Sequence, residues 1–248
     1  MNPECVIVVG LGEVGKPLFE LLSEHYNTLG VDINPVERPG ETDVLHICYP
    51  SQIGDFVGET IRYIQRYQPA LTIINSTVPV GTTRKIAEWT RRDVVNSPVR
   101  GKHSRMLADL HKYTKFVGAM RDAAGQKAAK HFQGAGLQTR VLSSPEASEL
   151  AKLTETTYFG LMIAWAQEVE RYCDQVGATY DDVVSFYNEI GFFPPVKYFP
   201  GIIGGHCVMQ NIELLAQSSP SGFLDAIRRS NEMKIEREIQ TTNVATLV

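Results

Sequence analysis

The sequence predicts an α/β fold in which a doubly wound parallel sheet is followed by a long helix and a small all-helical domain. Two features of the chain carry this prediction. Short β-branched runs alternate with amphipathic segments through residues 1–143, the pattern of a parallel sheet with helices on both faces. Beyond that point apolar residues recur every three to four positions, which is the helical period. We therefore expect a sheet domain over 1–143 and a helical domain over 144–248.

The strands of the first domain are short runs rich in Val and Ile, and the helices between them have apolar residues at helical spacing. The expected strands are 5–10, 27–33, 43–50, 71–77, 93–98, 115–120 and 137–144. The expected helices are 14–26, 52–68, 83–92 and 123–135. The basic segment 99–105, which follows a strand, is expected to be a loop.

The helical domain opens with a helix predicted over 144–176, because no strong breaker follows Pro145. Apolar residues such as Leu161 and Trp165 go round more than one face of this helix, so we expect it to pack on two sides. Further helices are expected at 179–191, 211–217 and 222–240, with the Pro- and Gly-rich segment 192–207 as a loop.

The composition narrows the class of protein. The chain has 248 residues, 43% of them hydrophobic, which is enough for a substantial core. A net charge of -4 gives no electrostatic basis for binding nucleic acid. The four cysteines form no C-x-x-C pair, so neither a disulfide framework nor a metal site is expected. The first residues resemble neither a signal peptide nor a membrane span, and we expect a cytoplasmic protein.

A glycine-rich turn joins the first strand to the first helix. Gly10, Gly12 and Gly15 match G-x-G-x-x-G, which in a Rossmann-type fold gives the tight turn, the approach of a pyrophosphate and close helix packing. Asp32 ends the second strand, where a carboxylate accepts the ribose hydroxyls of NAD and repels the 2′-phosphate of NADP. The turn therefore predicts NAD binding, while Arg38 nearby leaves NADP open. The alternative is a glycine-rich turn in an unrelated α/β protein.

Other positions of the predicted cofactor site lie in the same turn and after two further strands. Open α/β sheets bind ligands at the carboxyl ends of their strands. The additional candidates are Glu13, Val14, Tyr49, Pro50 and Thr77.

Several motifs occur in a fixed order along the chain. They are VVGLGEVGKPL (8–18), NSTVPVGTTRKI (75–86), SPVRG (97–101), the stretch 148–183, FPGIIGGHC (199–207) and SNEM (230–233). Together they resemble the UDP-glucose/GDP-mannose dehydrogenase family over essentially the whole chain. The resemblance implies an NAD-binding domain, a central helical domain and a homodimer formed through the long helix. The family's third domain, which binds the nucleotide of the sugar, is expected to be absent because the chain stops at Val248.

The resemblance also implies three catalytic residues. Cys207 in GGHC matches a cysteine that captures an aldehyde and forms a thioester; on its own, a thiol on a glycine-flanked loop beside His206 can be exposed and partly ionised. Lys152 matches a lysine that faces the substrate hydroxyl, and Thr77 matches a threonine that holds an active-site water. The alternatives are a structural cysteine, a solvated lysine and a threonine that caps a turn.

Three positions depart from the pattern of this family. Thr156 replaces an asparagine, Asn211 replaces an aspartate and Val99 replaces a glutamate. Asparagine cannot act as a base, and losing a general base typically costs about two to four orders of magnitude in rate. We keep Thr156 and Asn211 as candidate catalytic positions, but the departures argue against a four-electron oxidation.

A basic cluster follows Val99 and supplies candidate substrate-binding residues. It consists of Arg100, Lys102, His103 and Arg105, and we add His206 to the same candidates. Such groups can hold a carboxylate or phosphate by charge-assisted hydrogen bonds. A solvated basic loop is the alternative.

Three functions remain open on the sequence. The first is an NAD-dependent dehydrogenase of a small or phosphorylated alcohol, with Lys152 and Cys207 at the reacting carbon. The second is a two-electron β-hydroxyacid-type dehydrogenase in which Cys207 is a bystander. The third is a non-catalytic subunit that binds NAD or a nucleotide.

Overall fold

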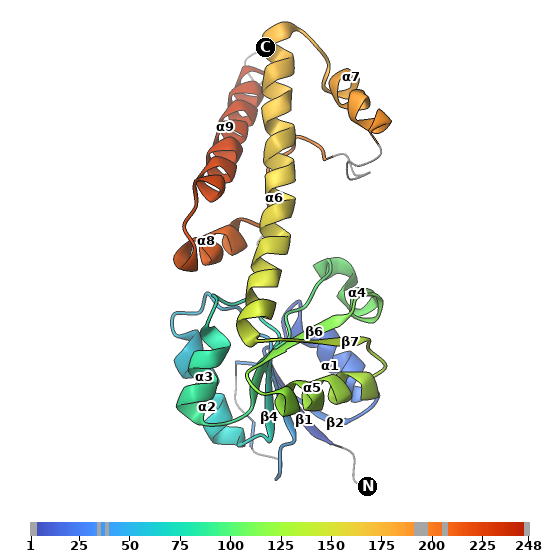
Figure 1. The fold of residues 1–248 in the computed structure, drawn as a ribbon, viewed down its shortest axis with the longest axis vertical. Coiled ribbons are helices and arrows are strands. Elements are labelled where there is room, and N and C mark those ends of the chain that lie inside the picture. The colour runs from blue at the N-terminus through green and yellow to red at the C-terminus, as the bar shows by residue number, and fades with distance from the viewer. Residues whose placement is uncertain (1–3, 34–35, 38–39, 191–197, 205–207, 246–248) are drawn as a thin grey trace. The chain divides into compact units, whose positions relative to one another are not determined.

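The computed structural model describes residues 4–33, 36–37, 40–190, 198–204 and 208–245. The chain divides into two compact units, Met1–Lys152 and Leu153–Val248 (Figure 1). The first unit contains the predicted sheet and the second is helical, so the predicted fold class is confirmed.

The sheet of the first unit has seven strands in the order β2-β1-β3-β4-β5-β6-β7. The strands are β1 Cys5–Val9, β2 Asn27–Val31, β3 Val44–Ile47, β4 Leu71–Ile74, β5 Val94–Asn96, β6 Lys115–Ala119 and β7 Thr139–Leu142. Neighbouring strands pair in parallel except β5 and β6, which run antiparallel. The sheet is therefore mostly parallel, as predicted, with one reversal toward its far side.

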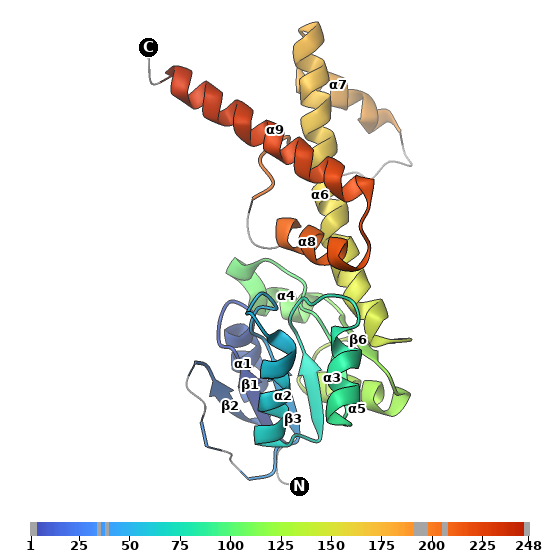
Figure 2. The same cartoon turned by 90° about the vertical axis from the view of Figure 1, so that its left-hand side faces the viewer.

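Helices cover both faces of this sheet, which makes it doubly wound (Figure 2). The helices are α1 Gly15–Ser23, α2 Phe56–Tyr67, α3 Thr82–Thr90, α4 Met106–Lys112 and α5 Asp122–Gly134. Leu18, Leu110 and Phe132 from α1, α4 and α5 share one apolar cluster. Ile64 and Ile86 from α2 and α3 lie in a second cluster, on the opposite face.

The predicted loop over 99–105 is wrong in its second half. Residues His103–Arg105 form a short 3-10 turn, η1, which leads directly into α4. Helix α4 has only seven residues, and its buried apolar side chains are Met106 and Leu110. A single pair at this spacing is too short a pattern to stand out from a basic loop.

Helix α6, Pro145–Val176, begins within the first unit and is anchored there by two carboxylates. Glu149 accepts hydrogen bonds from the backbone N–H groups of Gly81 at 2.6 Å and Thr83 at 2.8 Å. These two N–H groups lie at the amino end of α3, so Glu149 caps that helix. Burial raises the pKa of Glu149, and the amide donors oppose this rise. Glu146 pairs with Arg84 at 2.5 Å.

The second unit consists of the remainder of α6 and the helices that follow it. They are α7 Tyr180–Ser185, η2 Phe186–Glu189, α8 Val208–Ser218 and α9 Gly222–Ala245. The helix predicted at 179–191 is thus an α-helical turn continued by a 3-10 turn. Val169, Cys173 and Val184 form an apolar cluster between α6 and α7.

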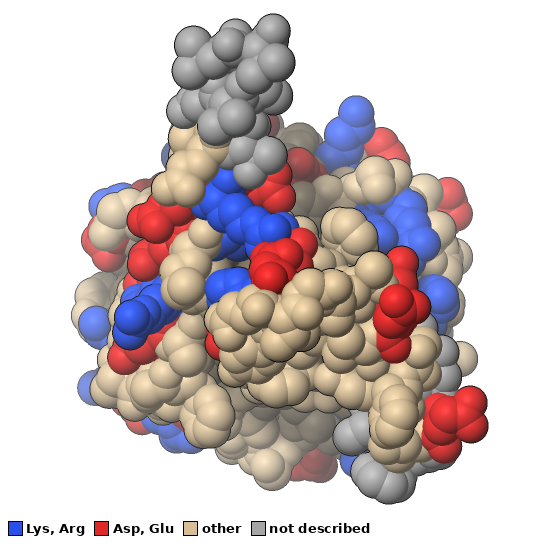
Figure 3. Space-filling view, turned by 90° about the horizontal axis from the view of Figure 1, so that it is seen from above, with Lys and Arg blue, Asp and Glu red and all other residues tan. Residues whose placement is uncertain are grey.

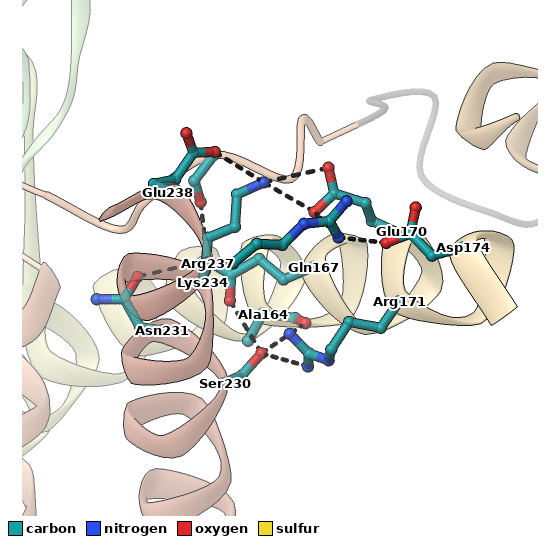
Figure 4. Close-up of polar contacts among 11 residues, drawn as sticks. Ala164, Gln167, Glu170, Arg171, Asp174, Ser230, Asn231, Lys234, Arg237 and Glu238 are labelled. Atoms are coloured by element: carbon teal, nitrogen blue, oxygen red, sulfur yellow. Dashed lines mark hydrogen bonds and ion pairs between the residues drawn. The ribbon is translucent and has the colours of Figure 1, made fainter. Parts of the chain in front are cut away.

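Polar contacts join α6 to α9 (Figure 4). Lys234 donates to the Glu170 carboxylate at 2.8 Å, and Arg237 pairs with Asp174. Asn231 is 4% exposed and bonds the backbone of Ile203 in both directions, accepting at 2.7 Å and donating at 3.1 Å. The side chain of Asn231 therefore holds the segment before α8 against α9.

The surface drawn in Figure 3 carries charges of both signs side by side. Lys and Arg side chains alternate there with Asp and Glu side chains instead of forming a field of one sign. Among the described residues, no helix is both long enough and apolar enough to cross a membrane.

Candidate functional site

The glycine-rich turn follows β1 at the point where the strand order changes direction, since β1 lies between β2 and β3. Ligands of open α/β sheets bind at such switch points. Gly10 has φ +88, and a Cβ there would lie 2.7 Å from the backbone N of Tyr49. A Cβ on Gly15 would lie 1.8 Å from the carbonyl oxygen of Gly10, so only glycine allows α1 this close to the strand.

Gly12 differs from Gly10 and Gly15 in being exposed, and a Cβ built on it has no atom within 4 Å. The space beside this backbone is therefore open. The adjacent amino end of α1 has Val14 as its N-cap, without a side-chain hydrogen bond and without an acidic residue in the first turn. The amino end of α3, by contrast, is occupied by Glu149. Of these two helix ends, α1 is the one that can receive the anionic part of a ligand.

The residues that follow β2, β3 and β4 lie along the same edge of the sheet as this turn. Asp32 directly follows β2 and is exposed. Ser76 donates a hydrogen bond of 2.6 Å to the carbonyl of Tyr49, which joins the segments after β3 and β4. Thr77, the next residue, is half-buried. The structure thus brings Gly10, Asp32, Tyr49 and Thr77 to one edge.

Tyr49 is itself held in place by α2. Its hydroxyl lies 2.7 Å from the hydroxyl of Thr60, and its ring contacts those of Phe56 and Tyr63. Burial raises the pKa of Tyr49, so it stays protonated. Pro50, the next residue, is exposed. The Tyr49 side chain is therefore held in a fixed position beside the candidate site, but it cannot act as an acid or base near neutral pH.

The predicted basic cluster does not converge on one point. The guanidinium of Arg100 lies over the rings of Tyr113 and Phe116, at 5.3 and 5.0 Å. Arg105 pairs with Asp109 at 3.1 Å. Lys102 is exposed, and its backbone N–H also bonds Asp109, at 2.9 Å.

His103 of the basic cluster lies at the glycine-rich turn. Its Nδ1 is 2.5 Å from a carboxylate oxygen of Glu13. This contact closes one side of the turn and brings an imidazole to the candidate site. A ligand phosphate at the turn would compete with Glu13 for this imidazole.

The predicted catalytic residues fall in several places. Lys152 is half-buried and is the last residue of the first unit. Cys207 and His206 lie outside the described residues. The described cysteines, Cys5, Cys48 and Cys173, are free thiols. Burial raises the pKa of Cys48 to about 12 and also raises that of Cys5, so neither is a ready nucleophile.

Two of the positions that depart from the family pattern contact each other in the second unit. The side-chain amide of Asn211, which is 4% exposed, donates to the Thr156 hydroxyl at 2.9 Å. The same hydroxyl donates to the carbonyl of Leu153 at 3.1 Å. Both substituted side chains are therefore engaged with the fold. Val99, the third departure, is buried in the sheet unit.

Sequence reasoning missed a buried polar cluster made of His46, Asn75, Lys115 and His131, with Glu4 at its outer end. His46 lies within an apolar strand, and His131 has no partner near it in sequence. Lys115 begins an apolar strand, and this was the only available signal. Among the described residues, no group of acidic, His and Cys side chains is arranged to hold a metal ion.

Comparison with known proteins agrees with the fold. The central domain of the UDP-glucose/GDP-mannose dehydrogenase family matches residues 146–233. A UDP-N-acetyl-D-mannosamine dehydrogenase of Methanococcus maripaludis is 23% identical over 277 residues, which cover 92% of this chain and 65% of that protein. An NDP-N-acetyl-D-galactosaminuronic acid dehydrogenase of Ralstonia nicotianae is 22% identical, with 92% and 69% covered.

The solved structure of a UDP-D-ManNAc dehydrogenase from Pyrococcus horikoshii has the same fold, with a TM-score of 0.81 at 22% identity. The superposition covers 96% of this chain and 72% of that one. The chain thus spans about two thirds of the length of these relatives. The fold and site define a Rossmann-type α/β protein with a helical second unit. Residues 146–233, most of which lie in the second unit, match the central domain of the UDP-glucose/GDP-mannose dehydrogenase family, and the predicted resemblance is confirmed.

Proposed function

We propose that this protein is an NAD-dependent oxidoreductase that oxidises an alcohol of a sugar-like or phosphorylated substrate. The observation that carries the proposal is the open backbone at Gly12, which lies beside the uncapped amino end of α1. Asp32 lies at the same edge of the sheet. A dinucleotide fits these groups: pyrophosphate at the amino end of α1 and the adenosine ribose at Asp32. NAD, when bound, accepts a hydride from the alcohol carbon.

The substrate class follows from the relatives, which are named as nucleotide-sugar dehydrogenases. UDP-sugars are therefore the first substrates to test, followed by sugar phosphates. Lys152 is proposed to receive or steady the proton that leaves the alcohol, since a half-buried lysine can act as a base. The basic residues 100–105 are proposed to hold an anionic part of the substrate, with His103 moving from Glu13 to the ligand.

Asp32→Ala is expected to weaken NAD binding by about tenfold or more while changing NADP binding little. The carboxylate bonds the ribose hydroxyls of NAD and repels the extra phosphate of NADP, so its loss penalises only the first ligand. Calorimetric titration of the wild type and the variant with both dinucleotides measures this. Equal weakening of the two would remove the role assigned to Asp32, and a wild type that binds neither would refute the proposal.

The number of electrons removed depends on Cys207. The hydrogen bond between Asn211 and Thr156 supports a two-electron reaction, because neither side chain can activate water for thioester hydrolysis. We expect Cys207→Ser to keep NADH formation from an alcohol substrate, measured by absorbance. Complete loss of turnover with NAD binding intact would instead favour the thioester route. If the wild type binds NAD but reduces none with any of the UDP-sugars and sugar phosphates tested, the remaining function is that of a non-catalytic, NAD-binding subunit.

We further propose that the protein is a cytoplasmic homodimer formed through α6. Large apolar side chains stand exposed on that helix: Tyr158, Phe159, Trp165, Tyr172 and Val176. Exposed apolar side chains in such number on one helix are typical of a surface that a partner covers. Light scattering at micromolar concentration tests this state, and a monomer would count against it.

A further inference from the structure

The buried polar cluster lies inside the first unit, on the face of the sheet that α5 covers. His46 comes from β3, Asn75 follows β4, Lys115 begins β6 and His131 lies on α5. Their exposed fractions are 0%, 1%, 3% and 3%, so water reaches none of them freely. Polar groups this deep require partners within the protein. Each of the four side chains has such a partner.

The hydrogen bonds of this cluster all point the same way. Nδ2 of Asn75 lies 3.2 Å from the carbonyl of Ile73 and 3.1 Å from Nδ1 of His46, so it donates and Nδ1 accepts. His46 then carries its proton on Nε2 and donates to Nε2 of His131 at 3.0 Å. His131 donates from Nδ1 to the Glu4 carboxylate at 2.8 Å. Burial lowers the pKa of His46 well below its usual value, which keeps that ring neutral.

Lys115 stands at the inner end of the cluster. Its Nζ donates to the carbonyl of Ser97 at 2.5 Å and to Oδ1 of Asn75 at 3.4 Å, and it lies 5.0 Å from the centre of the Phe132 ring. A carbonyl, an amide oxygen and an aromatic face are all electron-rich, so these surroundings suit an ammonium group. In a neutral amine, the lone pair would have to face one of them.

The side chains that shift the pKa of Lys115 are two cations and the thiol of Cys48. The pKa of Lys115 is lowered to about 7, mainly by burial and also by the charges of Lys152 and Arg100, while Cys48 opposes this shift. His46 also feels the charge of Lys115. The buried ammonium thus has hydrogen-bond partners, but within the described part of the chain the groups that shift its pKa include no carboxylate. A cation held under these conditions changes its protonation close to neutral pH.

The two oxygen atoms that Lys115 holds belong to segments at the carboxyl edge of the sheet. Asn75 directly follows β4 and leads to Ser76 and Thr77, while Ser97 follows β5. The two segments also meet through the backbone N–H of Val99, which donates to the carbonyl of Asn75 at 3.3 Å. Lys115 therefore ties together the ends of two neighbouring strands from beneath the edge.

We propose that Lys115 is a positioning residue for the dinucleotide site, whose buried ammonium group holds the segments after β4 and β5 in the arrangement that presents Thr77 to the ligand. The inference rests on the proposed function for its ligand, but its structural half concerns only the first unit. Loss of the Lys115 proton weakens both hydrogen bonds to this group and leaves its lone pair facing an electron-rich neighbour. The edge then loosens as the pH rises through about 7.

The first test compares Lys115→Met with Lys112→Met, which makes the same Lys-to-Met replacement at an exposed position on α4. Calorimetry gives the affinity for NAD between about pH 6 and pH 9. We expect the wild type and Lys112→Met to lose about tenfold in affinity across this range. We expect Lys115→Met to bind weakly throughout, without that transition. The His103–Glu13 pair is present in all three proteins, so it does not distinguish them.

The second test needs no dinucleotide, so it still applies if the wild type fails to bind NAD and the proposed function fails. Backbone hydrogen exchange is followed at Ser97 and Val99, whose N–H groups bond the carbonyls of Ile74 and Asn75. Protection at these two amides should fall in the wild type as the pH rises through about 7, after correction for intrinsic rates, while Val8 in β1 stays protected. This measurement also serves if Lys115→Met does not fold. The inference is overturned by unchanged protection at both amides, or by a Lys115→Met variant with wild-type affinity and the same pH transition.

Discussion

Lys115→Met is expected to change the pH dependence of stability by about 3 kcal/mol between pH 7 and about pH 9.5. In the unfolded chain Lys115 has its ordinary pKa of 10.5, whereas in the folded protein burial lowers the pKa to about 7. Above pH 7 the unfolded state therefore holds a proton that the folded state has released. Stability rises with pH wherever the unfolded state binds more protons, by about 1.4 kcal/mol per pH unit for one group.

The wild type should thus gain stability over this range relative to the variant, which has no amine to titrate. Below pH 7 both states of the wild type hold the proton, so the difference between the two proteins becomes constant. There the variant should be the more stable one, because the folded wild type buries a charge at its full cost. Urea unfolding at several pH values measures both effects, with Lys112→Met as the control. Parallel curves for wild type and Lys115→Met would mean that the buried amine does not titrate in this range.

Raising the pH should therefore stabilise the fold while it weakens dinucleotide binding. A residue with a purely structural role would move both quantities in the same direction. Opposite movement would show that the ammonium form is retained for the arrangement of the site rather than for the stability of the sheet.

The second large effect is expected from a matched pair of substitutions in the glycine-rich turn. Gly15→Ala should destabilise the fold by about 1–3 kcal/mol or more, because the new Cβ would meet the carbonyl oxygen of Gly10 at 1.8 Å and α1 must shift. Gly12→Ala should change stability by less than about 0.5 kcal/mol, because its Cβ meets no atom within 4 Å.

Binding should show a different dependence on these two positions. Gly12→Ala places a methyl group where the pyrophosphate approaches, so NAD affinity should fall by about tenfold or more while the protein stays folded. Urea unfolding and calorimetry on the same preparations separate the two effects. A stable Gly12→Ala variant that binds NAD as well as the wild type would remove the turn from the ligand site.

The fold could be predicted because its signals are local. Runs such as 5–10 and 71–77 consist mostly of consecutive apolar residues, which by themselves predict buried strands. The glycines of the turn are also close together in sequence. The reversal of β6 was beyond such reasoning, because no residue within the strand reports the direction of its neighbour. Helix α4 was missed since its seven residues give less than two full turns of pattern.

The site was predictable only where its residues cluster along the chain. Gly10, Gly12 and Gly15 were identified from spacing, but the link from Glu13 to His103 joins residues that are distant in sequence. The same holds for the pair Asn211 and Thr156, which are 55 residues apart. Sequence reasoning recognised both as substituted positions but could not show that they bond each other. Long-range polar contacts carry no periodic signal, so the Lys115 cluster was also beyond its reach.

The carboxylate of Glu149 makes the amino ends of α1 and α3 unequal toward anions. Both α1 and α3 follow strands of one parallel sheet, and each amino end is a potential receptor for phosphate. At α3 the chain supplies its own permanent occupant, so an incoming phosphate would have to displace a buried side chain. An anionic group at this edge of the sheet is therefore favoured at α1 over α3. In the proposed complex, the pyrophosphate of NAD is therefore expected at α1 and not at α3.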